Sequence, residues 1–187
     1  SLTNITNMTF RIVEEITIDI LTKSTPRNLY ISVPDEIKEH PERTYPVVYM
    51  FDGHNLFFDE HATYGKSWGL KEYLEDHQVP VIVVGVECNH QGTGRLDEYS
   101  PYRARSEFGE LKGNGGIYMD WLVTELKPYI DSHYPTKPDR FHTFIAGSSM
   151  GGLMSLFSAV EYSDIFSKAA CLSPSVWLGT RKLLKMI

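Results

Sequence analysis

The chain has 187 residues, 42% of them hydrophobic, and a formal net charge of -6 at pH 7, a size that suits a single domain over residues 1–187. The acidic balance offers no basic stripe to displace counterions from phosphates, and no apolar stretch approaches the roughly 20 residues that span a bilayer. These features argue against a nucleic-acid partner and a membrane partner. Because the N-terminus lacks the regions of a signal peptide, we expect a cytoplasmic location.

Patterns of apolar residues predict the strands in the first half of the chain. Apolar and polar residues alternate over 10–13, 15–20 and 28–33, which is typical of antiparallel strands. Nearly continuous apolar runs follow over 45–51 and 79–86. Such runs suit parallel strands, because both faces of a parallel sheet are usually covered by other elements.

Two helices and a buried strand are expected next. Residues 66–76 can form a helix, and apolar residues at helical spacing predict another over 117–130. Pro128 lacks a backbone N–H, so we expect it to kink or fray that second helix. A strand rich in β-branched and aromatic residues is expected over 140–146, and His142 within it is interpreted as a core or sheet-face histidine.

The end of the chain completes an alternation of strands and helices. A helix is expected over 153–160 and a last strand over 169–172. This alternation predicts an α/β layered fold with a mostly parallel sheet. Cys88 and Cys171 each lie at the end of a predicted buried strand, so we expect structural thiols and no disulfide framework.

A long segment over 88–116 has neither a helical nor a strand period. A loop of that length inside a compact domain usually covers a site or moves. Arg95 and Tyr99 are candidates to line a pocket there. The alternative is that the charged and aromatic residues of the segment form local ion pairs and ring contacts.

The most informative motif places a serine between two glycines where a predicted strand meets a predicted helix. Gly147, Ser149 and Gly151 form a GxSxG pattern, which predicts a nucleophile elbow. A serine hydroxyl attacks a carbonyl only if it protrudes from a tight turn, and flanking glycines let the two backbones approach. The following helix directs its free N–H groups, that of Met150 foremost, toward the developing negative charge. The alternative is a tight glycine turn without chemistry.

A second loop carries Asp52, Gly53 and His54 directly after a predicted strand. In serine hydrolases of this layout, a Gly-containing loop after the third strand supplies the second oxyanion N–H, a role that we assign to the backbone of His54. The carboxylates and imidazoles of residues 52–54 and 59–61 also suit a metal ion, but we favour the oxyanion hole and expect no metal. Neither glycine-rich nucleotide fingerprint is complete, so no cofactor is expected.

Four segments, at residues 49–55, 125–131, 146–152 and 172–177, resemble the putative-esterase family of α/β hydrolases, which includes esterase D and the enterochelin esterases. The resemblance covers nearly the whole chain. It implies a three-layer α/β-hydrolase sandwich with a mostly parallel sheet and antiparallel N-terminal strands. It also implies hydrolysis of carboxylic esters of small or sugar-like alcohols by a Ser-Asp-His triad, without a metal. Acyl transfer through a covalent acyl-enzyme is the mechanism expected of the intact protein.

The triad of that family does not fit within this chain. The acid and then the histidine should follow the serine, whereas all seven histidines precede Ser149. Glu161 and Asp164 do follow it, but they lie on or near the helix that leaves the turn, which is the wrong place for a triad acid. Three explanations stay open: a C-terminally incomplete piece of a longer esterase, a non-catalytic ligand-binding pseudoenzyme, or recruitment of the His54 imidazole as the base.

We therefore predict a serine esterase with Ser149 as the nucleophile and the N–H groups of Met150 and His54 as oxyanion donors. The triad acid and base are expected outside the chain, which should turn over substrate only weakly. A sheet without its last strands also has an exposed edge, so the chain is expected to aggregate or to pair with another copy. The expected lining of the substrate pocket consists of Gly53, Arg95, Tyr99 and Trp177.

Overall fold

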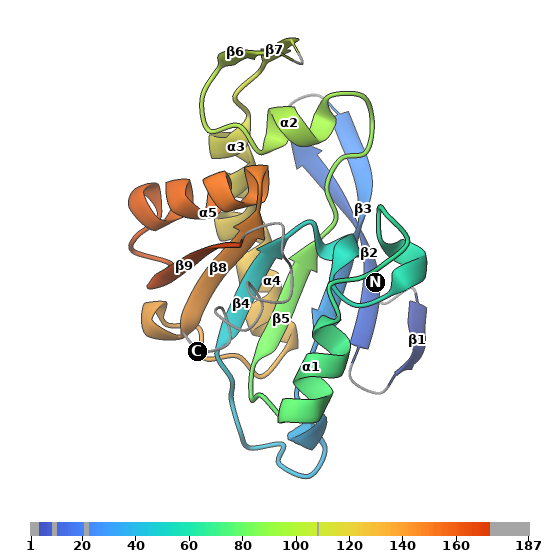
Figure 1. Cartoon of the computed structure of the whole chain (residues 1–187). Helices are drawn as coiled ribbons and strands as arrows, with labels where there is room; N and C mark the ends of the chain where they lie inside the picture. The colour runs from blue at the N-terminus through green and yellow to red at the C-terminus, as the bar shows by residue number, and fades with distance from the viewer. Residues whose placement is uncertain (1–3, 9–10, 21–22, 108, 173–187) are drawn as a thin grey trace.

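A single mixed sheet forms the centre of the protein (Figure 1). A computed structural model describes residues 4–8, 11–20, 23–107 and 109–172, and within these ranges the sheet has seven strands. The strands are β1 (Asn4–Met8), β2 (Arg11–Ile20), β3 (Lys23–Ser32), β4 (Val47–Phe51), β5 (Ile82–Val86), β8 (Thr143–Ser148) and β9 (Lys168–Leu172).

The sheet joins an antiparallel half to a parallel half. Its strand order is β1-β2-β3-β5-β4-β8-β9. Pairing is antiparallel from β1 through β3 to β5, and parallel from β5 through β4 and β8 to β9. The two alternating segments expected over 10–13 and 15–20 form one long strand, β2. The antiparallel N-terminal strands and the parallel strands behind them confirm the predicted α/β fold class.

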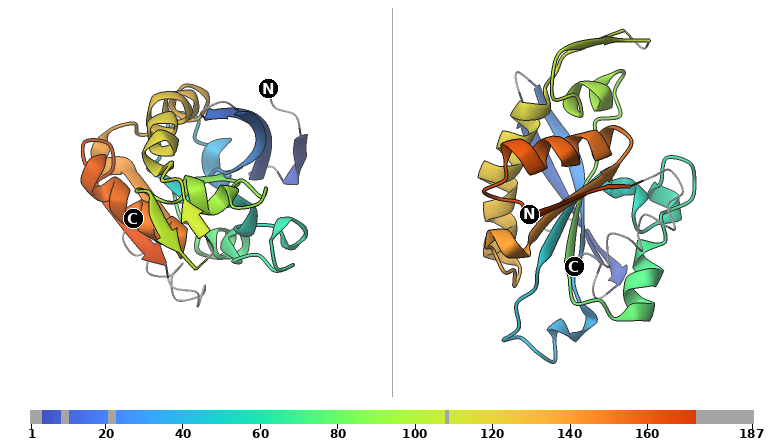
Figure 2. Two further views of the ribbon diagram at one scale, coloured as in Figure 1. Left: turned by 90° about the horizontal axis from the view of Figure 1, so that it is seen from above. Right: turned by 60° about the vertical axis from the view of Figure 1, so that its left-hand side comes forward.

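Helices and short turns connect the strands and cover both faces of the sheet (Figure 2). A small separate hairpin is formed by β6 (Ala104–Ser106) and β7 (Gly109–Leu111). The 3-10 turns are η1 (Asp35–Ile37), η2 (Gly53–Asn55), η3 (Asp59–His61) and η5 (Arg140–His142). The helices are α1 (Leu70–His77), α2 (Gly94–Glu98), α3 (Gly115–Trp121), the π-helical turn η4 (Leu122–Leu126), α4 (Lys127–His133) and α5 (Met150–Glu161).

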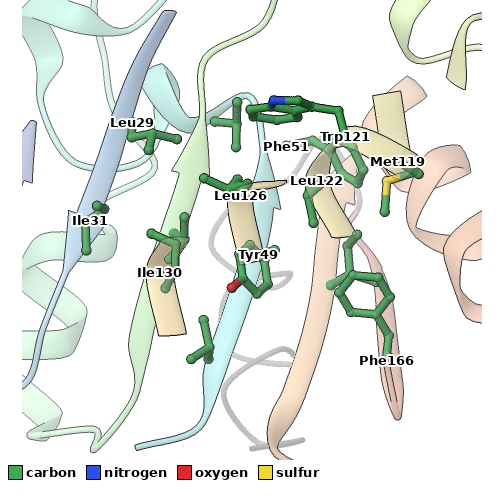
Figure 3. Close-up of a cluster of buried hydrophobic side chains, with 14 of the residues drawn as sticks. Leu29, Ile31, Tyr49, Phe51, Met119, Trp121, Leu122, Leu126, Ile130 and Phe166 are labelled. Atoms are coloured by element: carbon green, nitrogen blue, oxygen red, sulfur yellow. The ribbon is translucent and has the colours of Figure 1, made fainter. Parts of the chain in front are cut away.

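The alternation of side chains along the parallel strands creates two hydrophobic cores. On β4, Tyr49 and Phe51 point to the face covered by α3, η4, α4 and α5, where Ile130 is also fully buried (Figure 3). Val48 and Met50 point to the opposite face, which α1 covers. Because the chain buries apolar residues on both faces of these strands, it forms the three layers that the sequence predicts.

Pro128 does not end the helix that contains it. The segment runs without interruption from α3 through η4 into α4, and the predicted kink appears as a π-helical turn just before the proline. Lys127 donates its N–H to the carbonyl of Leu122, five residues earlier. A proline cannot donate the next backbone hydrogen bond, and a widened turn accommodates that loss without ending the helix.

Three local expectations are corrected by the structure. Helix α1 begins at Leu70, so residues 66–69 are not helical. His142 lies in η5 before the strand, where its Nδ1 is 2.8 Å from a carboxylate oxygen of Asp139, so it is neither a core nor a sheet-face residue. Cys88 is buried as expected, but Cys171 is exposed. Within the described ranges, every helix is too short or too polar to span a bilayer.

Truncation of the buried side chain of Ile130 tests the packing of α4 on the sheet. This side chain is 0% exposed, so Ile130→Ala should lower the free energy of unfolding by about 3 kcal/mol, measured by urea denaturation. Glu125→Ala, an exposed position of the same helical segment, is the matched control and should change stability by less than about 0.5 kcal/mol. Equal effects of the two substitutions would contradict the assigned packing.

Candidate active site

The chain reverses sharply at Ser149, between the end of β8 and the start of α5. Ser149 has φ 53° and ψ -122°, a conformation that residues with a Cβ atom rarely adopt. Its side chain is exposed, and it makes no capping hydrogen bond to the helix. The strand, tight turn and helix expected from the sequence are therefore present, with the hydroxyl held at the surface by a strained backbone.

Glycines make this reversal possible by removing side chains from the contact between strand and helix. A Cβ atom on Gly147 would lie 2.5 Å from the backbone of Gly151, and one on Gly151 would lie 2.9 Å from the Cβ of Phe51. A Cβ atom on Gly152 would lie 2.4 Å from the sulfur of Cys171. All three separations are shorter than atoms can tolerate, so α5 can lie this close to the sheet only with glycine at these positions.

Two backbone N–H groups beside the turn remain available as donors. Met150 is the first residue of α5, and the first N–H groups of a helix have no acceptor within it. His54 lies in η2, directly after the C-terminal end of β4. In the described ranges, neither amide is a donor in the backbone hydrogen bonds that join turns, loops and separate elements.

The loop that carries His54 is held by an ion pair between the buried Asp52 and the partly exposed Arg95. Asp52 has a positive φ of 55°, and its carboxylate accepts hydrogen bonds from Arg95 at 2.9 Å (Nε to Oδ1) and 2.8 Å (Nη2 to Oδ2). These hydrogen bonds raise the pKa of the Arg95 guanidinium, which stays charged. The Asp52 N–H also donates to the hydroxyl of Tyr99 at 3.1 Å. The loop is therefore held at both its side chain and its backbone.

A cavity of about 800 Å³ opens in front of Ser149 and His54. It is lined by Asp52, His54, Asn55, Thr63, Tyr64, Lys66, Ser67, Trp68, Cys88, Asn89, His90, Gly92, Arg95, Ser148 and Ser149.

Of the three described residues that were expected to line the pocket, only Arg95 does so. Arg95 reaches the cavity, although its guanidinium is bound to Asp52. Tyr99 is fully buried against the ring of Phe51, behind the cavity wall. Gly53 is also buried, and it packs so closely on β5 that a Cβ atom there would lie 2.2 Å from the backbone of Gly85. Trp177 lies outside the described residues.

The imidazole of His54 is buried in the cavity wall and is only 3% exposed. Its Nε2 lies 3.0 Å from the Thr63 hydroxyl, and its Nδ1 has no partner in the part of the chain that the structure describes. Burial lowers the pKa of His54, so the ring is neutral at pH 7. In the tautomer that donates its Nε2–H to the Thr63 hydroxyl, Nδ1 carries the lone pair.

Cys88 and His90, two further residues of the cavity wall, lie close to His54, which the sequence did not predict. Cys88 Sγ lies 3.6 Å from His90 Nδ1, and the rings of His54 and His90 contact edge to face, with centroids 4.7 Å apart. Burial raises the pKa of the Cys88 thiol to about 12, so it is protonated at pH 7 and a poor nucleophile. The Cys88 thiol is therefore not activated for nucleophilic attack.

The fold is a three-layer α/β fold with a mostly parallel sheet, and the chain belongs to the putative esterase family, which it matches over residues 22–181. The uncharacterized protein YbbA from Bacillus subtilis is 28% identical over 137 residues, which make up 71% of this chain and 51% of that protein. The chain spans about half the length of the curated relatives it matches.

Solved structures share the fold at low sequence identity. The BES protein from Bacillus cereus is 21% identical, with a TM-score of 0.63 over 98% of this chain and 70% of that chain. The enterobactin esterase FES from Shigella flexneri is 18% identical, with a TM-score of 0.62 over 88% of this chain and 38% of that chain.

The ion pair between Asp52 and Arg95 can be tested by a double-mutant cycle. Arg95→Ala leaves a buried carboxylate without its partner and should lower the free energy of unfolding by about 3 kcal/mol in denaturant titrations. Asp52→Asn removes the charge, so the double variant should recover part of that loss, with a coupling energy of about 1–3 kcal/mol. Additive effects of the two substitutions would show that the pair does not fix the loop.

Proposed function

We propose that the protein is a serine esterase in which Ser149 is the nucleophile and the turn around it is a nucleophile elbow. The observation that carries this proposal is the positive φ of Ser149 at the junction of β8 and α5, with an exposed side chain at a cavity. Membership in the putative esterase family supports it. So does the resemblance in fold to the Shigella flexneri enterobactin esterase.

In the proposed reaction, Ser149 Oγ bonds to the ester carbonyl carbon while its proton passes to a general base. The negative charge on the carbonyl oxygen is stabilised by the N–H groups of Met150 and His54, the two free amides beside the turn. The alcohol leaves with a proton, and water then hydrolyses the acyl-enzyme and returns the hydroxyl of Ser149. The general base and its acid partner are not assigned to residues of this chain.

The cavity favours esters of small, hydroxyl-rich alcohols. Its volume of about 800 Å³ is in the range of small-molecule sites, and polar side chains such as Asn55, Lys66 and Asn89 are prominent in its lining. Such groups hydrogen-bond hydroxyls and carbonyls. We therefore propose a polar ester, with a sugar-like alcohol as the leaving group.

Replacement of Ser149 tests the nucleophile directly. Ser149→Ala should abolish both hydrolysis of p-nitrophenyl acetate and covalent labelling by a fluorophosphonate probe, measured on the intact gene product. Ser148→Ala is a matched control, because this serine lines the same cavity one residue earlier, and labelling should persist. Labelling that survives Ser149→Ala would refute the nucleophile. A protein that binds esters without any labelling or turnover would support the pseudoenzyme instead.

A substitution of His54 separates its backbone from its side chain. His54→Ala keeps the N–H that serves as the proposed oxyanion donor, so fluorophosphonate labelling of Ser149 should persist, at a reduced rate because a cavity-wall side chain is lost. If the imidazole were the general base, the same substitution would reduce labelling to the background of Ser149→Ala. The measurement is the labelling rate of the purified variants.

A further inference from the structure

Three potential metal ligands from two separate loops meet in the cavity wall. His54 follows β4, whereas Cys88 and His90 follow β5, the neighbouring parallel strand. Because both strands end at the same edge of the sheet, their loops come together there. One nitrogen of each histidine and the sulfur of Cys88 all lie within 4.8 Å of one another.

An unsatisfied buried atom points to a ligand at this place. His54 is 97% buried, and in the described part of the chain its Nδ1 is one of the buried polar side-chain atoms without a hydrogen bond. A buried polar atom without a partner destabilises the folded protein, and a bound cation would offset that cost. The tautomer in which Nε2–H donates to the Thr63 hydroxyl leaves on Nδ1 the lone pair that a metal needs.

The second ring nitrogens are anchored as they are in metal sites. His54 Nε2 lies 3.0 Å from Thr63 Oγ1, and His90 Nε2 lies 3.0 Å from a carboxylate oxygen of Glu87. Metal-bound histidines usually donate their other N–H to an oxygen, which fixes the ring and the tautomer. His90 therefore presents its Nδ1 to Cys88, and the anchored ring of His54 leaves its own Nδ1 without a protein partner in the described ranges.

We propose that His54 Nδ1, Cys88 Sγ and His90 Nδ1 bind one Zn²⁺ ion. Zinc prefers nitrogen and sulfur ligands in a tetrahedron, for which bond lengths of about 2.0 and 2.3 Å place sulfur and nitrogen about 3.5 Å apart. The separation between Cys88 Sγ and His90 Nδ1 is 3.6 Å. Binding replaces the thiol proton, which passes to solvent, and the fourth ligand is a water from the cavity.

This site differs from the metal alternative considered from the sequence. That alternative combined residues 52–54 with 59–61, but His61 packs its ring against Tyr30 and Phe58 instead. Zinc at the proposed position lies in the wall of the cavity that Ser149 also lines. The inference itself does not rest on esterase activity, because it concerns binding of the ion alone.

Zinc titration of the chain after treatment with a chelator tests the proposal. Isothermal titration calorimetry should give one Zn²⁺ per chain for the wild type. Cys88→Ser and His90→Ala should each weaken that binding by more than about tenfold, since loss of a direct ligand costs at least as much as loss of an outer partner. Cys171→Ser and His61→Ala are the matched controls and should bind zinc as the wild type does.

A thermal shift provides the second readout. Zinc should raise the Tm of the wild type and both controls, but not that of His90→Ala. His90 is exposed, so this variant is expected to fold even if substitution of buried Cys88 disturbs the core. Absence of saturable binding to the wild type, or unchanged binding by His90→Ala, would overturn the proposal. Because neither readout needs turnover, failure of the esterase proposal would leave this test intact.

Discussion

The backbone must pass from β8 into α5 within a single residue, and the rest of the site depends on that reversal. Ser149 adopts a positive φ, which costs about 1–3 kcal/mol for a residue with a side chain. The surrounding fold holds it there because Gly147 and Gly151 let helix and strand approach more closely than any other residues would. Packing therefore sustains a strained turn, and the strain exposes one hydroxyl at the mouth of a cavity.

The second half of the site is fixed by charge instead of by close backbone packing. Asp52 also has a positive φ, and Arg95 holds its carboxylate from the segment that follows β5. The hydroxyl of Tyr99 accepts a hydrogen bond from the Asp52 N–H. These contacts bring the loop of His54 to the same edge of the sheet as Ser149, so the two proposed oxyanion donors come from different strands but face one cavity.

The sequence predicts the parts of the site that depend on local chemistry. The turn at Ser149 was predictable because its glycines have a local steric cause, and strand periods revealed the α/β alternation. Contacts between distant segments were not predictable in this way. Nothing in the spacing shows that Arg95 reaches Asp52, that Tyr99 is fully buried, or that Cys88 lies beside His54. These pairings arise only when neighbouring parallel strands align their ends.

A structure of the protein after reaction with a fluorophosphonate tests the central claim most directly. We expect the phosphorus atom to be bonded to Ser149 Oγ. A phosphoryl oxygen should lie about 2.7–3.1 Å from the backbone nitrogens of Met150 and His54, the distance at which such donors act. A phosphonyl group on another side chain, or a phosphoryl oxygen turned away from both amides, would contradict the proposed roles of these residues.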